Sequence, residues 1–207
     1  MKAVFVTGIH TDAGKTIASA ILCQALQMDY WKPIQSGADE DSDTLTVKGL
    51  LGETSSVFHP EAYRLQAPLS PHAAANIDGV EIVLHKIKRP NSDRLLIEGA
   101  GGLLVPLNNK DVVADLIQAD DKVVLVSRHY LGSINHTILS VAYLNQKGIV
   151  PGILFNGSEN PATEKAIANF GESTILGRID DAENVDADFV FLQSEKLKNE
   201  LEKWLME

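Results

Sequence analysis

One short stretch near the start of the chain limits the folds open to it. Residues 7–16 read T-G-I-H-T-D-A-G-K-T, and they lie between the apolar run 2–6 and a segment with helical spacing of apolar residues. Glycines let the backbone approach a ligand closely, and the free N–H groups at a helix start attract anions. The phosphate-loop pattern G-x-x-x-x-G-K-[ST] works in this way, although here five residues separate Gly8 from Gly14. The strand–loop–helix order favours a phosphate loop over a plain turn with a surface lysine.

The rest of the chain alternates between apolar runs and helical patterns. We expect strands at residues 29–34, 94–102, 122–127, 149–157 and 173–179. We expect helices at residues 14–27, 42–51, the second half of 73–89, 111–119, 133–148, 161–171 and 194–206, the last three starting at Ser133, Pro161 and Ser194. The segment 52–76 is expected to be irregular. This order predicts an α/β fold, a single P-loop NTPase-like domain over residues 1–207, with a mostly parallel sheet and helices on both faces.

Composition excludes several classes of protein. The formal net charge is −10 and the basic residues form no stripe, so nucleic acid binding is not expected. No apolar run is long enough to span a bilayer, and the first apolar run is too short for a signal peptide. The one cysteine, Cys23, cannot form an internal disulfide and fits a helix core. We therefore expect a cytoplasmic protein that does not act on membranes, with the acidic run 38–43 as a solvated loop.

Two carboxylates are candidates for binding a metal. Glu98 is at the end of an expected strand, where ligands bind in open α/β sheets, and Asp43 begins an expected helix. Mg²⁺ is usually held by one or two carboxylates together with phosphate oxygens and waters, and Thr16 of the glycine loop would add its hydroxyl. Each carboxylate also has an ordinary interpretation, since Glu98 could cap a turn and Asp43 could be a simple acid at a helix N-terminus.

Two lysines are candidates for contact with phosphate. Lys15 of the glycine loop would reach the β- and γ-phosphates, and Lys32 ends the second expected strand, where Pro33 keeps the chain extended. A lysine held there could neutralise transition-state charge, or it could be an exposed lysine at a sheet edge. Asp12 should face a metal or a cationic substrate, because a carboxylate beside phosphates is otherwise unfavourable.

Three later motifs are weaker. The run L-G-S-I-N-H at 131–136 precedes an expected helix, so the free N–H groups at 132–135 could hold a carboxylate or could form an ordinary helix start. Asn156 could bind a base edge, but N-G is also a common turn. His72, in P-L-S-P-H, could act as a base or could bond a backbone group.

Taken together, these motifs resemble those of dethiobiotin synthetase, over nearly the whole chain. The matching segments, in chain order, are T-G-x-x-T-x-x-G-K-T (7–16), K-P-x-x-S-G (32–37), S-D (42–43), P-x-S-P-H (68–72), E-G-A-G-G (98–102), L-G-x-I-N-H (131–136) and Asn156. The resemblance implies a cytoplasmic homodimer that uses ATP and Mg²⁺ to join CO₂ to 7,8-diaminopelargonic acid and to close a cyclic urea, giving dethiobiotin.

The resemblance also implies roles for individual residues. Lys32 and Lys15 would be catalytic. The nucleotide would contact Asp12, Ala13, Gly14, Lys15, Thr16, Ile17, Asp43, Glu98, Gly99, Ala100, Gly101 and Asn156, the last at the adenine. The metal would be held by Thr16, Asp43 and Glu98. The substrate would contact Thr11, Lys32, Ser36, Gly132, Ser133, Ile134 and Asn135, with the last four coming from the partner subunit.

The chain departs from the family pattern at three positions. Asp12 occupies a position where the family often has glutamate, Asp180 one where it often has proline, and Gly157 one where it often has aspartate. The last two changes fall at the expected base pocket, so nucleotide selectivity is left open. Alternative interpretations are a partitioning-type nucleotide switch, whose loop often carries an additional early lysine absent here, and a small-metabolite kinase, which would not explain K-P-x-x-S-G.

Overall fold

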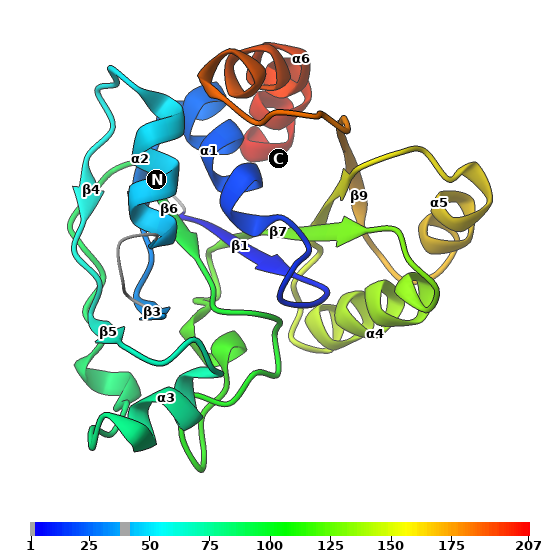
Figure 1. The fold of residues 1–207 in the computed structure, drawn as a ribbon. Coiled ribbons are helices and arrows are strands. Elements are labelled where there is room, and N and C mark those ends of the chain that lie inside the picture. The colour runs from blue at the N-terminus through cyan, green and yellow to red at the C-terminus, as the bar shows by residue number, and fades with distance from the viewer. Residues whose placement is uncertain (1–2, 38–41) are drawn as a thin grey trace.

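The computed structural model describes residues 3–37 and 42–207, so most of the acidic run 38–43 lies outside the described residues. Seven parallel strands form the central sheet in the order β4-β2-β6-β1-β7-β8-β9 (Figure 1). Their bounds are β1 Val4–Gly8, β2 Asp29–Trp31, β4 Phe58–His59, β6 Leu95–Glu98, β7 Lys122–Arg128, β8 Gly152–Asn156 and β9 Thr174–Ile179. A separate parallel pair consists of β3 Ile34–Ser36 and β5 Tyr63–Leu65.

Helices cover both faces of the sheet, as predicted (Figure 1). On one face lie α1 Lys15–Leu26, α2 Asp43–Leu51 and α6 Ala187–Met206. On the other face lie α3 Pro71–Ile77, α4 Ser133–Gln146 and α5 Pro161–Ala168. The described residues also include two short 3-10 helices, η1 Leu84–Lys86 and η2 Val113–Leu116. Within the described residues, no helix combines the length and the apolar character needed to cross a membrane.

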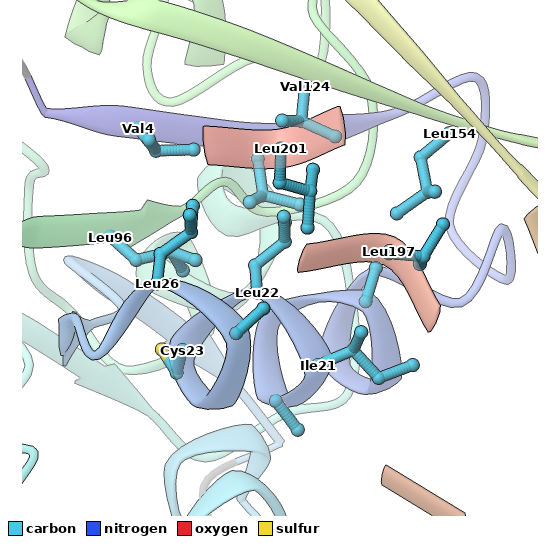
Figure 2. Packing of buried hydrophobic residues seen from close by; sticks show 14 of the residues in the cluster. Val4, Ile21, Leu22, Cys23, Leu26, Leu96, Val124, Leu154, Leu197 and Leu201 are labelled. Carbon is cyan, nitrogen blue, oxygen red and sulfur yellow. The ribbon is translucent and has the colours of Figure 1, made fainter. Parts of the chain in front are cut away.

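The apolar strands are buried on both sides. In β1, Val4 and Val6 belong to the core shared with α1 and α6, whereas Phe5 belongs to the core on the opposite face. Figure 2 shows Leu22 of α1 and Leu201 of α6 gathered beneath Val124 of β7, in the same core as Val4. A parallel sheet covered on both faces requires apolar residues at successive strand positions, which explains why these strands do not alternate with polar residues.

The expected second strand is broken. Residues 29–34 form β2 and the start of β3, separated at Lys32 and Pro33. The proline has no N–H to donate to a sheet ladder, so the regular strand pairing stops there. The break leaves Lys32 just beyond the end of β2, at the carboxyl edge of the central sheet. Segment 52–76, expected to be irregular, in fact contains β4, β5 and most of α3.

Helix boundaries account for the other corrections. The helix predicted in the second half of 73–89 lies in the first half instead. It is α3, which begins at Pro71 and ends at Ile77, just before Gly79, whose φ is +67°. Helix α4 is capped by Gly132 at φ +104° rather than by Ser133. Helix α6 begins much earlier than expected, because the Asp186 side chain accepts a hydrogen bond from the N–H of Phe189 at 2.9 Å. Segment 111–119 contains only the short η2.

Replacing Gly49 with alanine should stabilise the fold. Gly49 is an exposed helical residue of α2, and an added Cβ would meet no atom within 4 Å. Alanine loses less backbone entropy, so we expect a gain of about 0.5–1 kcal/mol in the free energy of unfolding, measured by urea denaturation.

The matched control is Gly52→Ala. An added Cβ at Gly52 also meets nothing within 4 Å, but its φ is +59°. The same chemical change should therefore destabilise the protein by about 1–2 kcal/mol. Equal effects of the two variants would contradict the explanation from backbone conformation.

Candidate active site

The glycine loop connects β1 to α1 and is held in place from two sides. Gly14 caps α1 with φ +93°, a left-handed conformation that glycine adopts without a Cβ penalty. The side-chain amide of Asn156 donates to the carbonyl of Ala13 at 2.9 Å, and Lys15 Nζ donates to the carbonyl of Thr11 at 2.9 Å. The loop therefore presents the N–H groups of the α1 start at the carboxyl edge of the sheet, where an anion would be favoured.

The E-G-A-G-G turn lies against this loop. It follows β6, which is the neighbour of β1 in the sheet. A Cβ added at Gly102 would lie 3.2 Å from the carbonyl oxygen of Gly8, and one added at Gly99 would lie 3.1 Å from the Phe5 ring. Small residues at these positions allow the two turns to pack closely beside one another.

Four predicted residues converge in front of the loop. Lys32 forms ion pairs with Asp43 and with Glu98, whose Oε1 is 3.0 Å from Lys32 Nζ. The Thr16 hydroxyl is 2.7 Å from Asp43 Oδ1 and 3.2 Å from Glu98 Oε1. Each residue comes from a different segment: the start of α1, the end of β2, the start of α2 and the end of β6. Parallel strands place their carboxyl ends at one edge, which is why residues so distant in sequence meet there.

The charges in this cluster are strongly coupled. Burial alone would lower the pKa of Lys32, but Glu98 and Asp43 outweigh it, so the pKa is raised and the lysine stays charged. Burial would raise the pKa of Asp43, but Lys32 and Thr16 hold it below its ordinary value. Burial lowers the pKa of Lys15, and the nearby charge of Lys32 lowers it further, against the opposing effect of Glu98. The site therefore holds two lysines whose pKa values are shifted in opposite directions, upward for Lys32 and downward for Lys15.

A cavity of about 710 Å³ opens onto the cluster. Most predicted nucleotide and substrate residues line it: Thr11, Asp12, Gly14, Lys15, Thr16, Ile17, Lys32, Ser36, Asp43, Glu98, Ala100 and Gly101. Three of the predicted nucleotide residues do not line it: Ala13 is buried within the loop, Gly99 packs on Phe5, and Asn156 supports the loop from the side. The volume of this cavity is in the range typical of small-molecule sites.

The predicted turn at 132–135 does not line this cavity. Gly132, Ser133, Ile134 and Asn135 line a second cavity of about 760 Å³, together with neighbours that include Tyr130 and Leu131. Leu131 is fully exposed. Within one chain, the structure therefore does not bring this turn to the cluster around Lys32.

Two contacts of the site are absent from the sequence-based predictions. Tyr30 donates its hydroxyl to Glu98 Oε2 at 3.0 Å, and Gln35 Oε1 accepts the backbone N–H of Asp43 at 3.2 Å. In the sequence, Tyr30 is indistinguishable from an ordinary strand residue, and no sequence motif indicates either contact. The pairing of β2 with β6, which brings Tyr30 toward Glu98, was the missing information. His72, by contrast, is exposed, and its backbone N–H donates to the carbonyl of Pro106 at 3.3 Å.

The far end of the sheet carries an ion-pair network. Glu164 of α5 accepts hydrogen bonds from Arg178 and from the N–H of Asn160, and it is 3.0 Å from the ring nitrogen Nε2 of His129. Burial would raise the pKa of Glu164, but these donors outweigh it and hold the pKa below its ordinary value of 4.5. Nearby, the Asp180 carboxylate is bound by Lys196 at 2.7 Å.

The Glu164→Gln variant should show a pH-dependent stability loss. Because the folded-state pKa is lowered, the charge of Glu164 contributes stability above the unfolded pKa, and this contribution disappears as pH falls through the folded pKa. We expect the variant to be less stable by about 1–2 kcal/mol at pH 7, with the difference shrinking below about pH 4. Urea unfolding at several pH values measures it.

The exposed pair on α6 gives a control for that measurement. Glu200 lies 3.9 Å from Lys203, and Glu200→Gln should change stability by less than about 0.5 kcal/mol. A difference between wild type and Glu164→Gln that stays constant from pH 7 to pH 3 would contradict the assignment.

Comparison with known proteins agrees with the fold and the motifs. A family model described as an AAA domain matches residues 2–188. The ATP-dependent dethiobiotin synthetase BioD of Christiangramia forsetii is 52% identical over 202 residues, covering 97% of this chain and 98% of that protein. The protein of the same name from Cytophaga hutchinsonii is 50% identical over 201 residues, covering 95% and 97% respectively.

Solved structures with similar folds are more distant in sequence. A putative plasmid partition protein from Borrelia burgdorferi, bound to AMPPNP, has a TM-score of 0.61 at 12% identity and covers 99% of this chain and 98% of its own. The MinC:MinD cell division protein complex of Aquifex aeolicus gives a TM-score of 0.58 at 14% identity, covering 100% and 96%. At these identities the likeness shows the fold alone.

The parallel sheet, the glycine loop at its centre and these structural neighbours define a P-loop NTPase fold. Within that class the chain belongs to the ATP-dependent dethiobiotin synthetase family, since relatives of that name share about half of its residues along nearly its whole length. The resemblance drawn from the motifs is thereby confirmed.

Proposed function

We propose that this protein forms dethiobiotin from 7,8-diaminopelargonic acid, CO₂ and ATP, as a ligase of biotin biosynthesis. The observation that carries the proposal is the cluster of Lys32, Glu98, Asp43 and Thr16 facing the glycine loop, in a chain whose relatives carry that enzyme name. The cytoplasm, where ATP and thiol-reducing conditions occur together, is the proposed location.

The glycine loop and the carboxylates would bind ATP with Mg²⁺. Thr16, Asp43 and Glu98 offer only oxygen atoms, the donor type that Mg²⁺ prefers. Among the described residues there is no group of three or more His, Cys, Asp or Glu side chains able to hold a metal, so phosphate oxygens and waters would complete its shell. Bound there, Mg²⁺ would neutralise charge on the phosphates. Lys15 and the loop amides would hold the phosphate oxygens.

Lys32 would hold the negative charge that develops on the substrate. An alkylammonium has a pKa of about 10, and the positive charge of the two lysines favours loss of its proton. The free amine attacks CO₂ and forms a carbamate anion. Lys32, kept charged by its two carboxylates, and Lys15 would orient this anion beside the γ-phosphate. Thr11 and Ser36 line the same cavity and would contact the diamine or its carbamate.

Ring closure needs no covalent attachment to the protein. A carbamate oxygen attacks the γ-phosphorus and the bond to ADP breaks, leaving a mixed anhydride. The second amine then attacks the carbonyl carbon and loses a proton, the bond from that carbon to the phosphate oxygen breaks, and the new C–N bond, the second of the two, closes the cyclic urea. The residues contribute positioning and charge stabilisation, which is the usual mode of catalysis in phosphoryl transfer.

A homodimer would complete the substrate site. We propose that the turn at 132–135 reaches the partner's cavity and that its N–H groups, at the start of α4, bind the substrate's tail carboxylate. Two observations support this arrangement: the turn lies apart from its own chain's cluster, and Leu131 beside it is fully exposed. Analytical ultracentrifugation tests the dimer independently of activity.

The deciding experiment measures phosphate release with MgATP, with and without the diamine and bicarbonate, and follows dethiobiotin by mass spectrometry. We expect release that requires both substrates, with dethiobiotin formed in equal amount. ATP hydrolysis that ignores the diamine but responds to a partner protein would instead favour a partitioning-type switch. Hydrolysis that requires a hydroxyl acceptor would favour a kinase. Repeating the assay with CTP and GTP settles the base selectivity that Asp180 and Gly157 leave open.

A further inference from the structure

Tyr30 is a buried tyrosine of β2 whose side chain reaches the active-site edge. It is completely buried, and its ring lies 6.0 Å from the ring of Phe58 on the adjacent β4. In the sheet register, Tyr30 pairs with Leu96 of β6. Glu98 is two residues further along β6, so it points to the same face as Leu96. The phenol hydroxyl therefore extends diagonally toward the carboxyl edge and meets the Glu98 carboxylate.

The two carboxylate oxygens of Glu98 have different hydrogen-bond partners. Tyr30 donates its hydroxyl to Oε2 at 3.0 Å. Oε1 instead accepts from Lys32 at 3.0 Å and from Thr16 at 3.2 Å. The Glu98 side chain has no exposed surface, so no bulk water competes for Oε2. The hydroxyl of Tyr30 thus occupies one oxygen and turns the other toward the glycine loop.

We propose that Tyr30 is a positioning residue that fixes the Glu98 carboxylate for binding Mg²⁺ with the nucleotide. The proposal rests on the proposed function, because it takes Glu98 as a metal-binding carboxylate. Carboxylates that bind metals are themselves held by hydrogen bonds, and loss of such an outer contact typically costs 10–100-fold in metal affinity. Phenylalanine would fill the same apolar space, so the hydroxyl is the feature that this role needs.

The Tyr30 hydroxyl contacts Glu98 Oε2, whereas the Lys32 amine contacts Oε1. A hydroxyl donor orients the carboxylate without bringing a positive charge to it, in contrast to Lys32 on the other oxygen.

The Tyr30→Phe variant tests the proposal without relying on turnover. Mg²⁺ is titrated calorimetrically into the protein saturated with AMPPNP, and thermal melting is recorded with and without Mg²⁺. We expect the Mg²⁺ dissociation constant to rise about tenfold. The increase in melting temperature that Mg²⁺ produces in the AMPPNP complex should shrink accordingly.

Trp31→Phe is the matched control on the same strand. Trp31 is also buried, and its ring N–H donates to the carbonyl of Pro60 at 3.0 Å, away from Glu98. This variant should melt at a lower temperature than wild type but keep the wild-type Mg²⁺ dissociation constant. It separates loss of a buried hydrogen bond in β2 from loss of the contact with Glu98.

The possible results distinguish this proposal from the proposed function. An unchanged Mg²⁺ dissociation constant in Tyr30→Phe, with lower melting temperatures in both conditions, would show that the hydroxyl only supports the fold and would overturn the proposal. If wild type binds Mg²⁺ with AMPPNP but forms no dethiobiotin, the proposed function fails, and the tenfold change in metal affinity still tests Tyr30. A Tyr30→Phe variant that binds Mg²⁺ more tightly would also overturn it.

Discussion

Lys32→Ala is expected to lower turnover by at least about 100- to 1000-fold. Removal of one positioned donor to a developing negative charge typically has an effect of this size. Lys32 is only 4% exposed and forms ion pairs with both Asp43 and Glu98, so its positive charge is held between the two carboxylates. Single-turnover formation of dethiobiotin under saturating MgATP measures the loss at the chemical steps.

The same substitution should also destabilise the fold. It leaves the buried carboxylate of Glu98 without its lysine, and breaking a buried pair in this way typically costs about 3–5 kcal/mol. Sequence alone gave no reason to expect this cost, because an exposed lysine at a sheet edge was an equally good interpretation. Turnover must therefore be measured well below the melting temperature of the variant, with circular dichroism confirming that it is folded.

A surface lysine provides the control. Lys203 of α6 has a side chain that is 66% exposed, and it lies 3.9 Å from Glu200. Lys203→Ala should leave turnover unchanged and alter stability by less than about 0.5 kcal/mol. A folded Lys32→Ala protein with turnover close to that of wild type would remove Lys32 from the proposed mechanism.

The sequence predicted the parts of the fold that depend on local pattern. The apolar run 122–127, predicted to be a strand, lies in β7, and the helical spacing that starts at residue 15 corresponds to α1. The βαβ order led to a parallel sheet with two covered faces. The convergence of Glu98 with the glycine loop also followed, because the carboxyl ends of neighbouring parallel strands share one edge.

The remaining details depend on contacts that local pattern does not contain. The start of α6 was misplaced because Asp186, rather than Ser194, caps it, and Ser194 is buried in the helix. The role of Tyr30 depends on β2 lying beside β6, and strand order is not encoded in the spacing of apolar residues. The burial of Lys32 has the same origin, since it follows from where β2 ends in the assembled sheet.

Gly14→Ala is expected to reduce ATP binding and turnover by about 100-fold or more. Gly14 has φ +93°, which alanine adopts only with strain. An added Cβ would also lie well inside van der Waals contact with the side-chain nitrogen of Asn156. That nitrogen donates to the carbonyl of Ala13, so the clash would displace the loop at Ala13 and Gly14, directly before Lys15. A displacement of about 1 Å at a phosphate site is enough for a loss of this size.

Two further variants separate the causes of that loss. Gly49→Ala makes the same chemical change in α2, away from the loop, and should leave AMPPNP affinity unchanged. Asn156→Ala alone removes the amide contact with Ala13 but leaves the backbone at residue 14 unstrained, so its loss of AMPPNP affinity, measured by calorimetry, should be smaller than that of Gly14→Ala. Wild-type affinity in the single Gly14→Ala variant would show that the phosphates do not bind at the start of α1. In that case the opening glycine motif of the chain would be a structural turn, and the nucleotide site would have to be sought elsewhere along the carboxyl edge of the sheet.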